Sequence, residues 1–217
     1  MLKRRVTRGF TIIELMVTIA IVAIILMLGV PSFSSLLQNH KLTSAAKSFT
    51  EGLQVARTEA IRRNTSVEFV LSSAPLTGVA DNDAAGAVQS VTGPNWVVRV
   101  PSGTGPVTYA AVEAKAAQDS SAGTATSVTV VGAVASGAPV STTFAGTIAF
   151  NGLGVPLDNS GSLNTAGAYV LRVENPGGGT CAAAGGQMRC MQIRVRPGGQ
   201  IQLCDPAVTD ARDSRSC

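Results

Sequence analysis

A single carboxylate, that of Glu14, lies inside an otherwise apolar run near the N-terminus. The run extends from Phe10 to Val30 and contains no other charged residue. It is about as long as the ~20 residues that an α-helix needs to cross a hydrocarbon core. A carboxylate in such a helix is costly, so by default it marks a contact with a functional partner. Glu14 is therefore the first residue for which we expect a specific role.

The residues ahead of the run are basic and set its orientation. MLKRRVTRG contains Lys3, Arg4, Arg5 and Arg8 and no acidic residue. The positive-inside rule places this end in the cytoplasm. We therefore expect everything after Val30 to be exported across the membrane.

Four cysteines form a second candidate group near the C-terminus: Cys181, Cys190, Cys204 and Cys217. In an exported segment such cysteines form disulfides. A metal site built from the four thiolates is the alternative, but no C-x-x-C pair is present, so we predict disulfides and no metal. Three pairings are possible, and the sequential one would close two short loops. The sequence leaves the connectivity open.

Arginines near the C-terminus are candidates for phosphate binding. In MQIRVR (191–196) strand alternation places Arg194 and Arg196 on one face, and Arg212 and Arg215 follow in the tail. These four residues could contact DNA.

The charge balance argues against DNA binding by these arginines. The net charge is +4, but without the first nine residues 17 − 4 = 13 basic residues face 13 acidic ones. Asp210 and Asp213 alternate with the tail arginines, and opposite charges nearby cancel the field. We expect a solvated strand face and a disulfide-closed tail.

Other residues that could do chemistry have simpler interpretations. His40 is the only histidine, and a lone histidine on a polar helix face forms no metal cluster. The glycine-rich stretches 176–180 and 182–188 lack the GK[ST] of a phosphate loop, so we predict turns. Trp96 is expected in the core. No Ser/His/Asp or paired-carboxylate arrangement is present, so we predict no enzyme and no cofactor.

The apolar run is expected to continue as an amphipathic helix. Beyond Pro31 apolar residues recur mostly three or four positions apart, which defines one helix face. They are Phe33, Leu36, Leu37, Leu42, Ala45, Ala46, Phe49, Leu53, Ala56 and Ala60. The other face carries Lys41, Lys47, Glu51, Arg57, Arg62 and Arg63. Pro31 should interrupt the helix, because proline lacks the amide that would bond to Met27.

Beyond residue 65 the period of the pattern changes to two. Short strands bounded by Gly, Pro, Asn and Ser are predicted at 66–71, 95–100, 127–134, 147–150, 168–173, 190–195 and 200–204. Residues 78–93 and 110–125 are rich in Ala, Gly, Ser and Thr and are expected to be loops or edge insertions. The fold class is α+β: a long N-terminal helix, transmembrane and then amphipathic, packed against an antiparallel sheet or sandwich.

The N-terminal pattern resembles the type IV prepilins. These have a short basic leader and then G-F-T-[IL]-[IL]-E-L-M-V, which Gly9, Phe10 and Glu14 match residue for residue. The resemblance implies that a prepilin peptidase cuts after Gly9 and methylates Phe10. It also implies that Glu14 serves filament assembly as the counter-charge of a neighbouring subunit's α-amine. The proline matched by Pro31 marks a kink in pilins, a segment that can loosen within the filament.

The C-terminal half is similar to the H-type (GspH) pseudopilins and FimT/FimU minor pilins. FNGLGVP (150–156), two following strands and the turn RPGGQIQLC (196–204) carry this resemblance. Some FimT-branch members capture DNA through a basic tail with G-R-x-R. Here the corresponding stretch is GGQIQ, which departs from that motif.

We therefore predict a pilin-like, non-enzymatic protein. Its expected parts are a prepilin leader (1–9), a transmembrane helix (10–30), an amphipathic continuation (31–64) and a periplasmic β-rich domain (65–217). It would be a single-pass inner-membrane minor pilin or pseudopilin that joins the initiating or tip complex of a type IV pilus or type II secretion pseudopilus. Its partners would be other pilins or pseudopilins and the prepilin peptidase. The alternative is a DNA receptor for uptake.

Overall fold

The structure is a computed structural model, and its description covers residues 9–77, 80–90, 93, 95–102, 108–116, 129–133, 146–158, 161–163, 168–175 and 179–217. At 28–35, 80–81 and 129–133 only the backbone is described. The chain divides into two compact units, Met1–Leu37 and Gln38–Cys217. Each unit is described by itself.

Helix α1 extends from Ile12 to Arg63. Its backbone is helical on both sides of Pro31. Pro31 therefore does not end the helix, and in this respect the expected interruption is wrong. Proline removes one backbone hydrogen bond, and a helix can continue past it. The predicted kink falls among residues 28–35, whose side chains lie outside the description.

All seven predicted strands are present, shifted by no more than a few residues. The observed strands are β1 (Val67–Ser72), β2 (Asn95–Ser102), β3 (Thr108–Ala116), β4 (Thr129–Ala133), β5 (Thr147–Phe150), β6 (Tyr169–Glu174), β7 (Met191–Val195) and β8 (Ile201–Cys204). Short helices α2 (Ala80–Ala85) and η2 (Ala182–Ala184) complete the described elements.

Strand β3 and helix α2 fall in segments predicted as loops or edge insertions; β3 is an edge strand of its sheet, and tertiary contacts explain both elements. The alanine-rich sequence of β3 has low strand propensity, but the strand pairs along its length with β2. The guanidinium of Arg99 on β2 donates to the carbonyl of Ala84 in α2 at 3.0 Å. It also pairs with Glu68 at 2.8 Å and lies 3.5 Å from the ring centroid of Tyr109 on β3. Contacts between elements therefore stabilise β3 and α2, which the local sequence does not favour.

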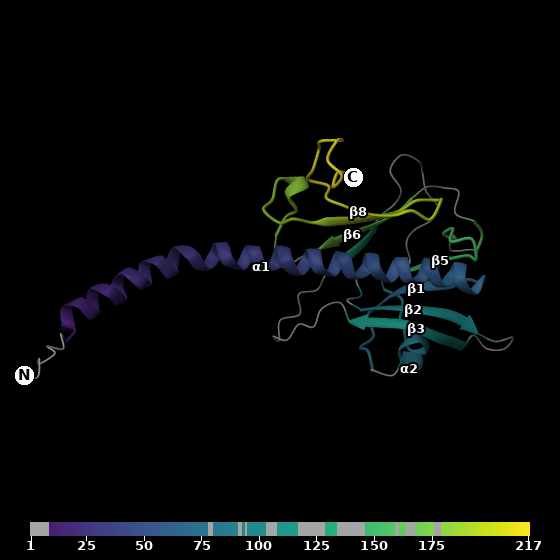
Figure 1. Ribbon diagram of the computed structural model, residues 1–217, viewed down its shortest axis with the longest axis horizontal. Coiled ribbons are helices and arrows are strands. Elements are labelled where there is room, and N and C mark those ends of the chain that lie inside the picture. Colours follow the sequence, from purple (N-terminus) through teal and green to yellow (C-terminus); the bar gives the residue numbers. More distant parts are fainter. Residues whose placement is uncertain are drawn as a thin grey trace, which may run out of the picture. The chain divides into compact units, whose positions relative to one another are not determined.

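The strands form two antiparallel sheets rather than one. Sheet A has the order β3-β2-β1-β5, and sheet B has the order β4-β6-β7-β8. Figure 1 shows β6 and β8 on one side of the second half of α1 and β1, β2 and β3 on the other. The α+β class with a long helix against antiparallel strands is confirmed.

The predicted apolar face of α1 is confirmed from Leu42 onward. The buried helix residues are Leu42, Ala45, Ala46, Phe49, Leu53, Ala56 and Ala60. They share one hydrophobic cluster with inward residues of both sheets, such as Phe69 and Trp96 of sheet A and Leu171 and Ile193 of sheet B. Farther toward the N-terminus Leu36 and Leu37 are exposed, so the buried face begins later than expected.

Small residues on this face let sheet A approach the helix closely. Gly52 of α1 lies against Phe69 and Trp96, whose nearest ring atoms would be 2.8 and 2.9 Å from an added Cβ. The Trp96 indole N–H donates to the hydroxyl of Ser48 at 2.9 Å. Trp96 is fully buried, as predicted.

Candidate processing and assembly sites

The predicted processing site lies just ahead of the first turn of α1. Thr11 caps the helix, because its hydroxyl accepts the Glu14 N–H at 3.3 Å and its carbonyl accepts the Leu15 N–H at 3.2 Å. Gly9 and Phe10 are exposed and precede the helix. A Cβ added at Gly9 would meet nothing within 4 Å. Packing against the described residues therefore does not require glycine here.

Glu14 occupies the third position of the helix, so Thr11-x-x-Glu14 is the sequence signature of a capping box. This signature is readable in the sequence. The Glu14 side chain is exposed. Among the described residues no cation lies within ion-pair distance of its carboxylate.

Large apolar side chains of the first unit are exposed along the helix. They include Phe10, Ile12, Ile13, Leu15, Met16, Val17, Ile19, Ile21, Val22, Ile24, Ile25, Leu26 and Met27. Among the residues that the structure describes, no helix combines the length and the apolarity that a membrane span needs.

The predicted disulfides are present, and their connectivity is sequential. Cys181 bonds to Cys190 with a Cα–Cα distance of 5.4 Å. Cys204 bonds to Cys217 with a Cα–Cα distance of 5.2 Å. Within the described residues no cluster of potential ligands could hold a metal ion.

The second disulfide closes the C-terminal tail back onto the end of β8. The Asp205 N–H donates to the carbonyl of Arg215 at 2.7 Å. The Asp205 carboxylate accepts from Arg189 at 2.7 Å, and Arg189 lies in the loop of the first disulfide. An ion pair and backbone hydrogen bonds therefore support the tail in addition to the covalent link.

The four arginines proposed to contact DNA are mostly engaged within the protein. Arg194 donates to the carbonyl oxygen of Cys217, and Arg196 donates to Gln202 at 3.3 Å. Arg215 forms an ion pair with Asp213 at 2.6 Å. The side-chain hydrogen bond from Arg215 lowers the pKa of Asp213 to about 2, so this carboxylate stays charged at neutral pH.

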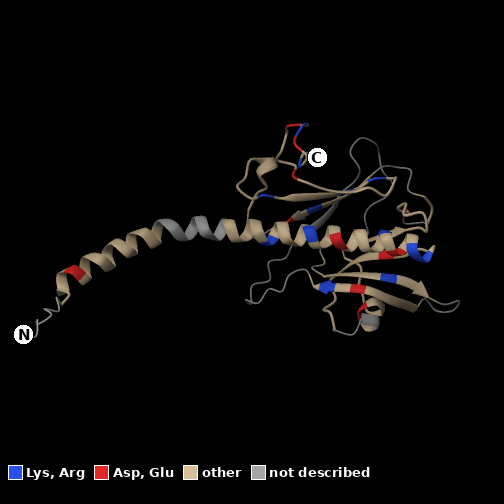
Figure 2. Cartoon of the chain, in the orientation of Figure 1, with Lys and Arg blue, Asp and Glu red and all other residues tan. Residues whose placement is uncertain are grey.

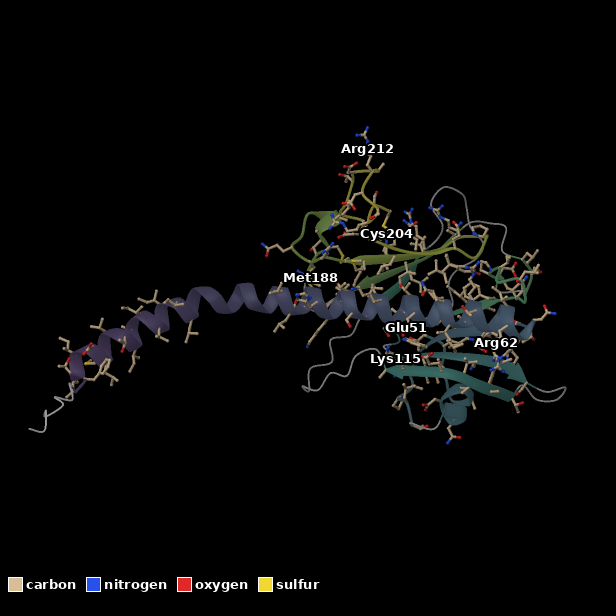
Figure 3. The ribbon with its side chains drawn as sticks, in the orientation of Figure 1. Glu51, Arg62, Lys115, Met188, Cys204 and Arg212 are labelled. Carbon is tan, nitrogen blue, oxygen red and sulfur yellow. A yellow bond between two sulfur atoms is a disulfide. The ribbon has the colours of Figure 1, made fainter. Side chains whose placement is uncertain are left out.

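Arg212 differs from these three. Its only described hydrogen bond is made by the backbone, whose N–H donates to the side chain of Asp210 at 2.9 Å. Its side chain extends from the tip of the tail (Figure 3). Acidic and basic residues alternate along the tail in Figure 2. The arrangement gives no continuous cationic strip, which is what the neutral charge balance predicts.

One junction between distant segments of the domain involves Arg57, which we had placed on the exposed face of the helix. Its Nε donates to the carbonyl of Gly154 at 3.1 Å. Gly154 and Gly199 both have a positive φ, and a Cβ on Gly199 would lie 2.0 Å from that same carbonyl. Arg57 thus holds together the FNGLGVP turn (150–156) and the RPGG turn, which are distant in sequence. The sequence signal that could have indicated an inward contact is that Arg57 directly follows Ala56, which is buried.

A cavity of about 390 Å³ opens beside the first disulfide. Its lining combines Arg172 and Glu174 of β6 with the apolar side chains of Ala183, Ala184, Met191 and Pro206 and the cysteines 181 and 190. No pattern in the sequence predicts this cavity, because its walls come from four separate segments.

Matches to protein-family models show the family of the chain. The model described as "Type II transport protein GspH" matches residues 45–199, more than half of the sequence. The chain belongs to this family. In this GspH-family protein the model described as "Prokaryotic N-terminal methylation motif" matches residues 4–30. No curated protein matches the sequence.

One solved structure is similar in fold to this GspH-family protein. It is the crystal structure of the type IV minor pilin FimU of Pseudomonas aeruginosa PAO1, at 15% sequence identity and a TM-score of 0.46. The similarity covers 78% of this chain and 92% of that one.

Family membership confirms that this protein is a pseudopilin or minor pilin and not an enzyme. Its methylation motif, which includes Gly9, Phe10 and Glu14, is the kind processed by prepilin peptidase. Such a protein is anchored in the inner membrane before assembly and assembles with other pilins.

Proposed function

We propose that this GspH-family protein joins the complex that initiates or tips a type IV pilus or a type II secretion pseudopilus. Glu14 carries the proposal. Its carboxylate is exposed and has no cationic partner among the described residues. A charge in an apolar helix is tolerated when a partner compensates it. After cleavage behind Gly9, the α-amine of a neighbouring subunit's first residue is the partner of suitable charge.

The cleavage product fits this role. Phe10 becomes the first residue, and Glu14 lies four residues farther on, about one helical turn away. Residues 10–30 serve as the membrane anchor in this proposal, and the domain beyond it is periplasmic. The DNA-receptor alternative loses support, because three of its four candidate arginines donate to groups within the domain.

The decisive experiment replaces Glu14 by Gln, which keeps the shape and removes the charge. We expect the variant to be cleaved and inserted normally but to co-purify poorly with its partner subunits from membranes. Glu51→Gln is the matched control, because Glu51 is 56% exposed on the same helix and should not affect co-purification. Normal recovery of partners with the Glu14 variant would remove the basis of this assembly role.

Processing is tested separately by intact-mass measurement of the membrane-extracted protein. We expect a mature chain that begins at methylated Phe10, and an unprocessed chain when Gly9 is replaced by a larger residue. A Cβ at Gly9 meets none of the described residues within 4 Å, so failure of cleavage would report the requirement of the peptidase and not misfolding.

A further inference from the structure

The cavity beside the first disulfide is lined by a cation and an anion, Arg172 and Glu174. Among the described residues neither has an oppositely charged group within ion-pair distance. They lie two residues apart on β6, so strand alternation places them on one face. Leu171 and Val173, on the other face, are buried in the core. Both charges are therefore available to a ligand.

The loop that forms one wall of the cavity is held in place. The disulfide between Cys181 and Cys190 closes this loop, and helix η2, two of whose alanines line the cavity, lies within it. The Ala182 N–H donates to the carbonyl of Met188 at 2.6 Å. Met188 itself is buried in the core. The η2 wall is therefore fixed to the domain without a ligand.

Arg189 links this loop to the segment that follows β8. Its Nε donates to the Asp205 carboxylate at 2.7 Å, and the next residue, Pro206, lines the cavity. Its backbone N–H donates to the side chain of Asn39 at 2.9 Å, which joins the loop to α1. A binding site whose walls are fixed in advance loses less entropy when the ligand binds. The volume of about 390 Å³ also lies within the range of roughly 300–1,000 Å³ that is typical of ligand pockets.

The spacing of the two charges indicates the ligand that fits. A strand rises by about 3.2–3.4 Å per residue, so residues 172 and 174 are roughly 6.5 Å apart along β6. Two residues of an extended peptide span at most about 7 Å, which matches this spacing. A dipeptide carries an α-ammonium and an α-carboxylate group at its two ends at neutral pH. The end of a longer chain carries only one of these charges, so it would leave either Arg172 or Glu174 without a partner.

We propose that this cavity binds a zwitterionic dipeptide with apolar side chains. The guanidinium of Arg172 donates to the carboxylate of the dipeptide, and the ammonium group of the dipeptide donates to Glu174. Charge-assisted hydrogen bonds of this kind are roughly twice as strong as neutral ones. The apolar side chains of the dipeptide contact the alanines, Met191 and Pro206 of the lining. This ligand site is separate from the assembly role of Glu14.

Calorimetric titration of the full chain in an uncharged detergent tests the binding. The probes are leucyl-leucine, its N-acetyl form and its C-terminal amide. We expect leucyl-leucine to bind and each blocked form to bind about tenfold more weakly, because each loses one hydrogen bond between charged groups. Leucine and trileucine should bind at least about fivefold more weakly than leucyl-leucine, since their charged ends do not match the spacing. Absence of leucyl-leucine binding at millimolar concentration, or equal binding of the blocked forms, would overturn the proposal.

Two variants assign the two ends of the ligand. Arg172→Gln should bind leucyl-leucine and its amide equally, to within about twofold, and should keep the preference for a free ammonium group. Glu174→Gln should show the reverse pattern. Lys115→Gln and Glu51→Gln are the matched controls, because these residues form an exposed pair and do not line the cavity. Equal weakening of all probes in either cavity variant contradicts the assignment of that end.

A lipid head group is the other common source of a zwitterion. Glycerophosphoethanolamine therefore serves as a further probe in the same titration. We expect it to bind at least about tenfold more weakly than leucyl-leucine, because its charges are closer together than the ends of an extended dipeptide and it has no apolar side chain. Binding as tight as that of leucyl-leucine would show that the cavity holds a lipid head group, and the dipeptide proposal would be wrong.

Discussion

At the scale of single residues, Gly52 shows how packing overrides helix propensity. Glycine inside a helix is less favourable than alanine by about 1 kcal/mol. At this position, however, an added Cβ would lie 2.8 Å from Phe69 and 2.9 Å from Trp96. The centroids of these two rings are 5.9 Å apart, and both residues are buried in the same core. The missing side chain is what allows the sheet to contact the helix.

We therefore predict that Gly52→Ala destabilises the domain. The overpacking cost of about 1–3 kcal/mol should exceed the gain in helix propensity. Urea denaturation should show a lower free energy of unfolding than for the unmodified chain. Gln54→Ala, at an exposed position two residues away, should change it by no more than about 0.5 kcal/mol. A stabilised Gly52→Ala variant would mean that the rings move aside without cost.

Glu59 yields a prediction about pH. Hydrogen bonds from Arg62 and then Arg63 lower the pKa of Glu59 from 4.5 to about 2. A lowered folded-state pKa stabilises the fold above the unfolded value, and this contribution is lost as the pH falls toward 2. Because the arginines are exposed, we expect Glu59→Gln to cost only about 0.5–1 kcal/mol at pH 7. The difference in free energy of unfolding between this variant and the unmodified chain should be smaller near pH 2 than at pH 7. A difference that is the same at both pH values would contradict the ion-pair explanation.

At the scale of elements, periodic signals were reliable and weakly patterned segments were not. The buried face of α1 and seven strands follow from spacing alone, because burial on one side imposes a period. β3 and α2 lacked such a signal, since their order depends on Arg99 of β2, which contacts Tyr109 of β3 and the carbonyl of Ala84 in α2. The junction at Arg57 was missed for the same reason: it joins two turns that only the fold brings together.

The tail is an element whose order depends on the disulfide between Cys204 and Cys217. Replacing both residues by alanine should lower the free energy of unfolding by about 2–3 kcal/mol, as expected for a loop of roughly this length. In hydrogen exchange, the Asp205 amide, now bonded to Arg215 at 2.7 Å, should lose protection. Amides in the β6–β7 ladder should keep theirs. Unchanged protection at Asp205 would show that the ion pair with Arg189 alone orders the tail.

At the scale of the whole molecule, charge decides between a filament subunit and a DNA receptor. Outside the leader the formal charge is zero, because 13 basic residues face 13 acidic ones. The soluble unit for the test must begin at Gln38, since α1 supplies core residues from Leu42 onward. A truncation after the helix would remove much of the core.

We predict that this unit binds duplex DNA at physiological salt no tighter than the non-specific range, roughly 10⁻⁴ to 10⁻⁶ M. A titration at low and physiological salt measures the affinity and its salt dependence. The comparison is a variant with Gln at Arg194, Arg196, Arg212 and Arg215. Sub-micromolar binding that this variant abolishes would establish the DNA receptor in place of the filament subunit.

The path of the chain between the two sheets has a consequence for biogenesis. β1, β2 and β3 belong to sheet A, β4 belongs to sheet B, β5 returns to sheet A, and β6 to β8 complete sheet B. Sheet A thus lacks an outer strand until residues 147–150 arrive, and β4 has no neighbour until β6 follows. Pairings of this kind are distant in sequence and form slowly. In the proposed topology the N-terminus stays in the cytoplasm and the chain beyond the anchor crosses the membrane in sequence order, so the emerging domain presents unpaired strand edges and a bare apolar helix face until most of it has emerged. During that interval the exposed apolar surface and strand edges make the chain most prone to aggregation.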